Sequence, residues 1–211
     1  MCYHYSLKAK QKTIEDHLGV RFAEEGETER VANGFGHPPM PVITGEFPAV
    51  AQFYVWGLIP FWLKKPQDAP KLARMCLNAR IETIAEKPSF KAAATHRRCL
   101  VPATSFFEWQ WQDETGREKV KHQIELADGS LMCFAGLWSI WTDPTTGADR
   151  PTFTICTTAA NDLMAHIHNT KQRMPVILRT PSERNAWLDG PADPDRFTAI
   201  AQAQDLVAHV V

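Results

Sequence analysis

The chain has 211 residues, 44% of them hydrophobic, and a formal net charge of −1. This length suits one domain with a substantial core, and the small net charge excludes global attraction to nucleic acid, which would need a local basic groove. No apolar stretch approaches the roughly 20 residues that cross a bilayer, and the start, MCYHYSLKAK, lacks the apolar core of a signal peptide. Five cysteines without a CxxC pair argue against a disulfide framework or zinc ribbon and favour a reducing, cytoplasmic compartment.

The chain is expected to begin with a helix and to continue mainly as strands. A helix is predicted over residues 11–18, followed by long Gly-, Pro- and Glu-rich loops over residues 24–48 around one short strand, VIT. Short apolar runs with β-branched and aromatic residues then predict strands of five to seven residues. These runs are VAQFYVWGLIPFW, RRCLVPA, SFFEWQW, KHQIEL, LMCFAGLWSIW, TFTICTT and MPVIL.

The remaining helices are expected to be short. They are predicted over residues 81–86, 89–95, 159–165, 182–188 and 194–203. Pro181 marks the start of the helix at 182, with Thr180 or Ser182 as its cap. Because strands and helices do not alternate as in a βαβ fold, we predict a single α+β domain over residues 1–211 with a largely antiparallel sheet core.

The second residue is a cysteine, and removal of Met1 would give it a free amine beside its thiol. Such a 1,2-aminothiol can form an imine with an aldehyde and then close to a thiazolidine ring, or the thiolate can attack an acyl carbon. An α-amine has an ordinary pKa of about 7.7–8.0, so it is partly neutral at cytosolic pH and able to attack a carbonyl. Cys2 is therefore the first candidate for a reactive residue.

Glu108 stands between large aromatic residues in the run SFFEW. A carboxylate in such surroundings loses hydration, which raises a carboxyl pKa toward the range useful for acid and base catalysis. The alternative is a glutamate on the wet face of a half-buried strand, alternating with Phe107 and Trp109. The residue type and position alone leave both interpretations open.

Two further polar segments carry candidate residues. His166 and His168, two apart on a predicted extended segment, would share one face, a spacing also found in metal sites. No carboxylate or second cysteine stands at matching spacing, so neither a metal nor any other cofactor is expected. Asn78 and Arg80 are either turn and surface residues or an amide and a guanidinium that recognise an anion.

These segments together resemble one family. The chain is similar to the SOS response-associated peptidase (SRAP) family in MC at its start, WGLIPFW at 56–62, NARIET at 78–83, RRCLVPATSFFEW at 97–109 and TTAANDLMAHIHNTKQRMPVIL at 157–178. The blocks follow the family's order and cover most of the chain. The resemblance implies a compact fold with a barrel-like β core and short peripheral helices. It also implies an enzyme-like DNA-damage protein that binds single-stranded DNA and joins its N-terminal cysteine to the aldehyde of an abasic site.

The resemblance also implies roles for the catalytic candidates. Cys2 would form the crosslink, and self-removal of Met1, the activity behind the peptidase name, would free its amine. Asn78 would hold the N-terminal amine or the opened sugar, Glu108 would shuttle protons, and His168 would protonate the sugar ring oxygen to favour the aldehyde. A lyase-like side activity belongs to the same expectation.

The implied DNA contacts are phosphate clamps and stacking side chains. Arg80 and Arg173 would be the clamps, and Trp62 and Trp109 would stack on or beside exposed bases. Family members commonly have Gly-Arg after the cysteine where this chain has Tyr3 and His4, so His4 would replace one phosphate contact only weakly at neutral pH. The partner is expected to be single-stranded DNA containing abasic sites, bound by a monomer in the cytoplasm or at the nucleoid, without a membrane.

Two other functions use the same residues differently. An amidohydrolase or peptidase with Cys2 as N-terminal nucleophile would need an acyl pocket and an oxyanion hole, in a larger layered fold with long strands. In a DNA- or protein-interaction module without catalysis, Cys2 would be incidental. A covalent adduct with abasic DNA would distinguish the crosslinking function implied by the family resemblance from these two alternatives.

Overall fold

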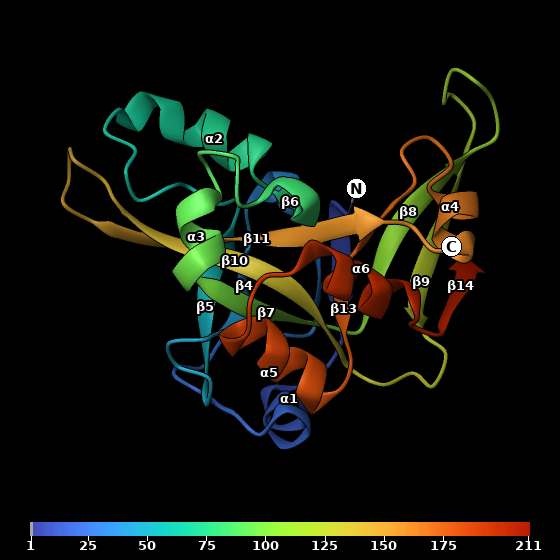
Figure 1. The fold of residues 1–211 in the computed structure, drawn as a ribbon, viewed down its shortest axis with the longest axis horizontal. Helices are drawn as coiled ribbons and strands as arrows, with labels where there is room; N and C mark the ends of the chain where they lie inside the picture. The colour runs from blue at the N-terminus through green and yellow to red at the C-terminus, as the bar shows by residue number, and fades with distance from the viewer. Residues whose placement is uncertain (1) are drawn as a thin grey trace.

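The computed structural model describes residues 2–211, and its first sheet carries the start of the chain (Figure 1). Five strands lie in the order β14-β9-β8-β1-β3, and each neighbouring pair is antiparallel. Their bounds are β1 (His4–Leu7), β3 (Arg30–Asn33), β8 (Ser105–Trp111), β9 (Lys119–Leu126) and β14 (Leu206–Val210). Because β1 lies between β3 and β8, the first residues of the chain are held inside a sheet.

The second sheet closes on itself. Its order is β12-β11-β10-β7-β4-β5-β2, and β11 also pairs with β5, so β5, β4, β7, β10 and β11 form a closed ring. β13 and β6 join it at β10 and β11. The bounds are β2 (Arg21–Phe22), β4 (Pro39–Thr44), β5 (Val50–Trp56), β6 (Asn78–Arg80), β7 (Arg98–Ala103), β10 (Met132–Thr142), β11 (Asp149–Ala159), β12 (Arg173–Pro175) and β13 (Ile177–Leu178). Within residues 2–211 only the pairs β11–β5, β11–β6 and β2–β5 are parallel.

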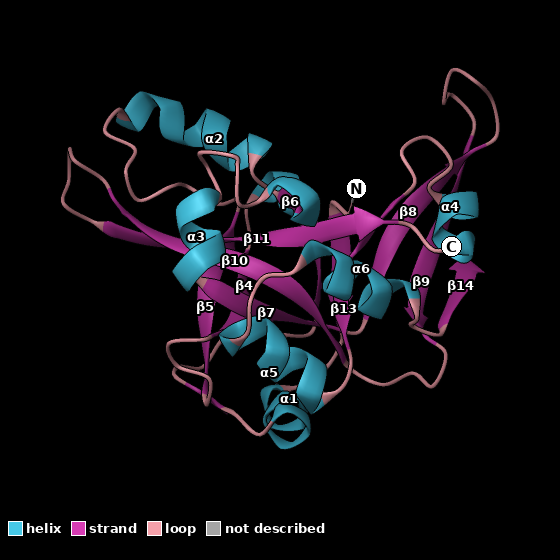
Figure 2. Ribbon diagram, viewed as in Figure 1, coloured by secondary structure: helices cyan, strands magenta, loops and turns pink. Residues whose placement is uncertain are grey.

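Short helices lie around the outside of the strands (Figure 2). Helix α5 covers the barrel through Trp187, a fully buried side chain whose indole N–H donates to the carbonyl oxygen of Cys99 over 3.0 Å. The α-helices are α1 (Gln11–Leu18), α2 (Ala69–Met75), α3 (Lys91–His96), α4 (Asp162–Ile167), α5 (Pro181–Asp189) and α6 (Pro194–Gln202). Three 3₁₀ turns are η1 (Gly34–Gly36), η2 (Pro66–Asp68) and η3 (Ile81–Thr83).

The predicted α+β class with a largely antiparallel, barrel-like core is confirmed. Several element predictions are wrong in detail. The run at 50–62 is a strand only to Trp56, because Gly57 has a φ of 120° and a proline follows at 60. The helix expected at 81–86 is a single 3₁₀ turn, and the one expected at 159–165 begins at Asp162, where Asn161 caps it. The strands β1, β2, β3, β6 and β14 and the helix α2 were not predicted.

Candidate active site at the start of the chain

The two sheets meet at Cys2. Strand β1 pairs with β8 so that His4 lies opposite Phe107, and β6 pairs in parallel with β11 so that Asn78 lies opposite Ile155. The side-chain amide of Asn78 donates a hydrogen bond of 2.9 Å to the carbonyl oxygen of Cys2. The start of the chain is thus fixed by the first sheet on one side and by an amide of the second sheet on the other. Figure 1 places this end between β6 and β8.

Glu108 and His168 form the ionisable part of the site. Glu108 is only 5% exposed, which excludes the alternative of a glutamate on a wet strand face. The Nε2 atom of His168 lies 4.0 Å from a carboxylate oxygen of Glu108, and its Nδ1 atom lies 2.9 Å from the carbonyl oxygen of Arg173. A carboxyl group and an imidazole therefore face each other in a largely dehydrated space.

The two histidines at 166 and 168 do not share a face. The prediction of an extended segment is wrong, because His166 lies in the last turn of α4 and His168 is its C-cap. The ring Nε2 of His166 accepts a hydrogen bond of 2.9 Å from the amide of Gln110, while His168 faces Glu108. Among residues 2–211 no group of three His, Cys, Asp or Glu side chains could hold a metal ion.

The charge of Glu108 acts on several neighbours at once. Burial raises the pKa of the Cys2 thiol, and the negative charge of Glu108 raises it further. The same two causes raise the pKa of Tyr3. Burial lowers the pKa of His168 although Glu108 opposes the shift. Burial, followed by the charge of Lys121, lowers the pKa of His4. At neutral pH the thiol and the imidazole of His168 are therefore uncharged.

Cys2 itself is fully buried, and its thiol donates a hydrogen bond of 3.6 Å to the carbonyl oxygen of His4. This burial is that of the full chain, in which Met1 precedes Cys2. The expected removal of Met1 concerns a residue that lies outside the described range of 2–211.

The two arginines expected to clamp phosphates differ in their surroundings. Arg80 is exposed at the end of β6. Arg173 is buried, and its guanidinium donates to both carboxylate oxygens of Glu82 over 2.6 and 2.9 Å and to the carbonyl oxygen of Thr157 over 2.6 Å. Arg80 therefore presents a charge to solvent, whereas the charge of Arg173 is balanced by Glu82, a contact that the sequence did not suggest.

The candidate stacking residues lie in separate places. Trp109 is half-buried on β8, its ring 5.0 Å from that of His4, and the ammonium group of Lys121 lies 5.9 Å from the Trp109 ring. Trp62 is 43% exposed in the loop before α2. The pairing of β8 with β9 places Lys121 opposite Trp109, and the sequence alone did not single out this lysine.

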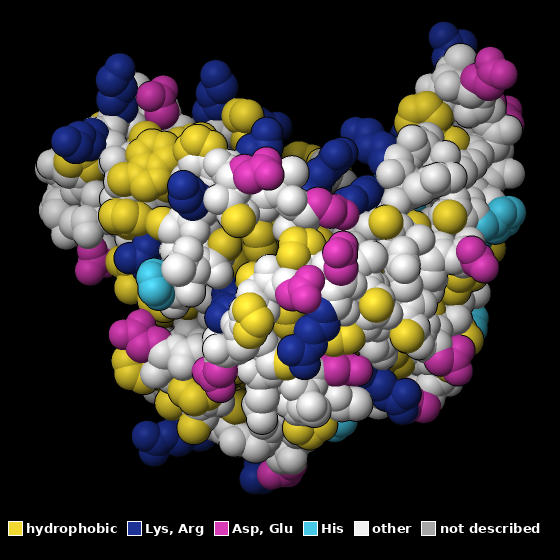
Figure 3. Space-filling view, in the orientation of Figure 1, with side chains coloured by type: hydrophobic (Ala, Val, Ile, Leu, Met, Phe, Trp, Pro, Cys, Tyr) yellow, Lys and Arg dark blue, Asp and Glu magenta, His cyan; other side chains and the backbone are white. Residues whose placement is uncertain are grey.

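One face of the molecule is hollowed near the start of the chain. Figure 3 shows Lys and Arg side chains gathered in the hollow between the α2 region and the β8–β9 hairpin. In Figure 1 the N-terminal end lies at the same place. A local concentration of positive charge thus adjoins the candidate site although the whole chain carries a net charge of −1. No helix within residues 2–211 is long and apolar enough to cross a membrane.

The closed, largely antiparallel barrel carries a buried cysteine, carboxylate and histidine and a partly buried amide near the start of the chain, which defines a mixed α/β protein with a candidate site at this end. The family model described as SOS response associated peptidase (SRAP) matches residues 1–211, so the chain belongs to the SRAP family. This agrees with the resemblance carried by the five sequence blocks.

Relatives and solved structures support the assignment. The chain is 41% identical over 151 residues to the abasic site processing protein YoqW of Bacillus subtilis, covering 71% of this chain and 62% of that protein. It is 31% identical over 175 residues to the abasic site processing protein HMCES of Gallus gallus, covering 74% and 51%. The chain thus spans about three-fifths or less of these relatives' length. A crystal structure of a Bacteroides thetaiotaomicron protein superposes with a TM-score of 0.88 at 34% identity, covering 100% of this chain and 92% of that one.

Proposed function

We propose that this protein processes abasic sites in single-stranded DNA by covalent capture through Cys2 after Met1 is removed. The observation that carries the proposal is the gathering of Asn78, Glu108 and His168 around the start of the chain. The names of its relatives, abasic site processing proteins, support the same substrate. The product is a thiazolidine that joins the protein to the opened sugar.

The chemistry proceeds in two bond-forming steps. Hydrolysis of the Met1–Cys2 peptide bond consumes one water and frees the amine. The amine adds to the sugar aldehyde, and loss of one water gives an imine. The sulfur then adds to the imine carbon while the thiol proton moves to nitrogen, which closes the ring without any oxidant or reductant. A lysine amine, which lacks the neighbouring thiol, would stop at the hydrolysable imine.

The buried side chains suit the proton movements of these steps. Since burial keeps the thiol protonated at neutral pH, a nearby base must accept its proton as the carbon–sulfur bond forms, and the Glu108 carboxylate is in electrostatic contact with Cys2. His168, facing Glu108, would donate a proton to the sugar ring oxygen, which favours the open aldehyde. Asn78 would keep the Cys2 backbone in position through its bond to the carbonyl oxygen.

DNA would be held by charge and stacking and not by base reading. Arg80 is exposed beside Asn78, and Trp109, with His4 and Lys121 against it, offers a ring to a neighbouring base. An aromatic contact of this kind contributes roughly 1–3 kcal/mol per base without sequence preference. Arg173 would contact phosphate only by giving up its bond to Glu82.

The direct experiment starts with mass spectrometry of the N-terminus, followed by incubation with an oligonucleotide containing one abasic site. We expect a denaturation-resistant adduct whose mass equals protein without Met1 plus DNA minus one water. The adduct is expected to be lost in Cys2→Ala and retained in Cys76→Ala, a matched change at another cysteine.

An N-terminal extension that cannot be removed separates the amine from the thiol. With the extension in place, Cys2 keeps its sulfur but its nitrogen is an amide, so no adduct is expected. Adduct formation by the extended chain would overturn the ring mechanism. Hydrolysis of an amide substrate without any DNA adduct would instead support the N-terminal nucleophile hydrolase.

A further inference from the structure

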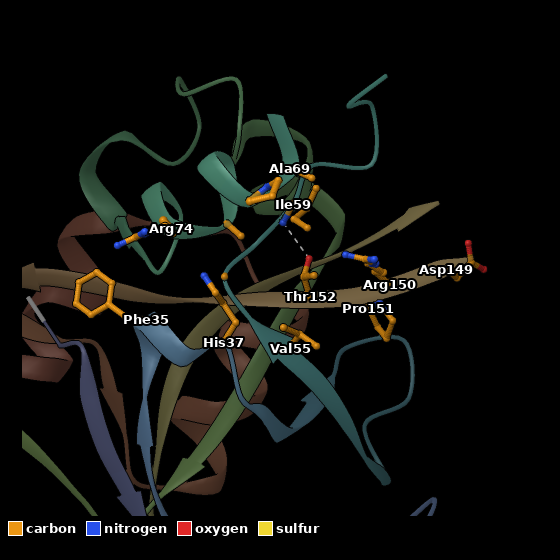
Figure 4. Close-up of a pocket in the computed structure, with 13 residues that line it drawn as sticks. Phe35, His37, Val55, Ile59, Ala69, Arg74, Asp149, Arg150, Pro151 and Thr152 are labelled. Atoms are coloured by element: carbon orange, nitrogen blue, oxygen red, sulfur yellow. Dashed lines mark hydrogen bonds between the residues drawn. The ribbon is translucent and has the colours of Figure 1, made fainter. Parts of the chain in front are cut away.

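A cavity of about 600 Å³ lies near the start of the chain, between the 3₁₀ turn η1, helix α2 and the parallel contact of β5 with β11 (Figure 4). Its walls are mostly apolar, with Val55, Ile59, Ala69 and Pro151 among the lining residues. This volume is within the range of small-molecule pockets. None of the residues assigned to the candidate active site lines it.

The cavity is directly connected to the segment that carries Cys2. The ring of Phe35, at one end of the cavity, lies 4.9 Å from the ring of Tyr3, the neighbour of Cys2. The backbone N–H of Gly34 donates a hydrogen bond of 2.9 Å to the carbonyl oxygen of Tyr3. A group bound against Phe35 would therefore lie beside Tyr3, the residue that follows Cys2.

The charged groups of the cavity are cationic on balance. Arg74 and Arg150 both line it, and among residues 2–211 neither forms an ion pair. Asp149 is the one carboxylate of the lining, and it accepts a 2.6 Å hydrogen bond from the hydroxyl of Thr142. Figure 4 shows Phe35 and Arg74 toward one end and Arg150 with Asp149 toward the other. An aromatic ring, apolar walls and two unpaired guanidinium groups match a planar base attached to phosphates.

Hydrogen bonds and close contacts restrict the backbone conformation around the cavity. The Nδ1 atom of His37 lies 2.8 Å from the carbonyl oxygen of Trp56, and the N–H of Ile59 donates to the hydroxyl of Thr152 over 3.0 Å. Gly57 has a φ of 120°, and a Cβ there would lie 2.6 Å from His37 and 2.8 Å from the carbonyl oxygen of Ala73. The lining is therefore largely formed before any ligand arrives, which lowers the entropic cost of binding.

We propose that this cavity holds one nucleotide of the captured DNA strand next to the abasic site. The base packs between Phe35 and the apolar wall, and Arg74 and Arg150 contact the phosphates on either side of it. This proposal rests on the proposed function, because it assigns the position of the strand relative to Cys2. It adds a site for an intact nucleotide to a protein whose proposed chemistry concerns a baseless one.

The test is a double-mutant cycle between a base and a side chain. The probe is a single-stranded oligonucleotide with tetrahydrofuran at the lesion, which has no aldehyde and cannot crosslink, so equilibrium affinity is measured. In a second pair of probes, the neighbouring base on the 5′ or the 3′ side is also replaced by tetrahydrofuran. Removing the base on one side is expected to weaken binding to the wild-type chain about tenfold, which corresponds to about 1.4 kcal/mol.

In Phe35→Ala the same base removal is expected to change affinity less than twofold. Arg74→Ala is expected to weaken binding equally for the probe that keeps the neighbouring base and the probe that lacks it. Phe47→Ala and Arg21→Ala, exposed residues outside the cavity, serve as matched controls and are expected to retain the wild-type sensitivity. Equal loss on base removal in wild type and Phe35→Ala, or none in either, overturns the proposal. Failure of the proposed function is detected separately, as absence of a Cys2-dependent adduct with true abasic DNA.

Discussion

At the scale of single residues, the site depends on one carboxylate that reaches four neighbours. Glu108 acts on Cys2, Tyr3, His4 and His168, and in each case its charge changes the neighbour's pKa in the same upward direction. For the two histidines this opposes burial, and for the thiol and the phenol it adds to burial. Strand β8 holds this carboxylate beside β1, whose first residue is His4 and which directly follows Cys2 and Tyr3, while His168 stands at the end of helix α4.

His168 gives the first prediction, which concerns stability against pH. Burial lowers its folded pKa below the ordinary value, so the unfolded chain binds a proton more readily. Stability is therefore complete above about pH 6.5 and decreases as pH falls through that value. His168→Gln should remove up to about 1 kcal/mol of this decrease between pH 7.5 and 5.5, measured by urea unfolding.

The control for this measurement comes from two partly buried histidines. Burial also lowers the pKa values of His4 and His122, so the wild type and His168→Gln share their contributions. The difference between the two chains isolates His168. An identical pH profile in both would contradict the prediction.

Gly57 gives the second prediction. Gly57→Ala places a side chain at a φ of 120° and within 2.8 Å of two neighbouring atoms, so we expect a loss of about 3 kcal/mol or more in the free energy of unfolding. Gly129→Ala is the matched control: its φ is 67° with nothing within 4 Å of the new Cβ, and about 1 kcal/mol should be lost. Chemical denaturation of both variants measures the difference, and equal losses would show that the close contact at Gly57 is relieved.

At the scale of elements, helix α5 begins with a capping sequence and carries a tryptophan that contacts strands far away in the chain. The hydroxyl of Thr180 accepts from the backbone N–H of Glu183 over 3.2 Å, and the Glu183 carboxylate accepts from the N–H of Thr180 over 2.9 Å. This capping box starts the helix whose Trp187 covers β7 and β10. Of the two caps that the sequence left open, Thr180 is the one used.

The third prediction follows from this cap. Thr180→Ala should reduce the free energy of unfolding by about 1 kcal/mol, because one backbone donor at the helix start loses its acceptor. Ser182→Ala, within the first turn of the helix, should change it by less than about 0.5 kcal/mol. Thermal or urea unfolding compares the two, and a larger effect at Ser182 would contradict the assignment of the cap.

The elements that the sequence predicted are those with strong local signals. The strands β7, β8, β10 and β11 have apolar runs, β9 has alternating β-branched and polar residues, and α5 has Pro181 and its cap. Strand β1 was not predicted because HYSL has only four residues, and its stability comes from pairing with β3 and β8. Helix α2 was not predicted because APKLARM is short and contains a proline, which is tolerated only in its first turn.

At the scale of the whole molecule, the candidate site joins segments that are far apart in the chain. Cys2, Asn78, Glu108 and His168 were found in the sequence because each stands in a polar block among apolar runs and because the blocks resemble one family. The bond between Glu82 and Arg173 spans 91 positions and depends on how β6 and β12 are placed on β11, so no local pattern indicates it. The cavity beside Phe35 is formed by four separate elements, η1, α2, β5 and β11, so no local sequence pattern indicates it either.

The fourth prediction concerns the field of the whole chain. With a net charge of −1, DNA binding would rest on few local contacts, here Arg80, Arg74 and Arg150. Three phosphate contacts to a single strand give a slope of log affinity against log salt of about −2. Each alanine substitution at one of these arginines should reduce the slope by about 0.7, measured by titration of non-crosslinking DNA at several salt concentrations. A slope near −5 would show that further cations contribute.

The hydrogen bond between the Asn78 amide and the Cys2 backbone has a consequence for biosynthesis. Cys2 is synthesised before the groups that surround it, the last of which is His168. A ribosome-bound chain that ends before His168 therefore lacks part of the candidate site, whether or not Met1 has been removed. The candidate site around Cys2 can therefore assemble only after residue 168 has been synthesised, 166 positions after Cys2 itself.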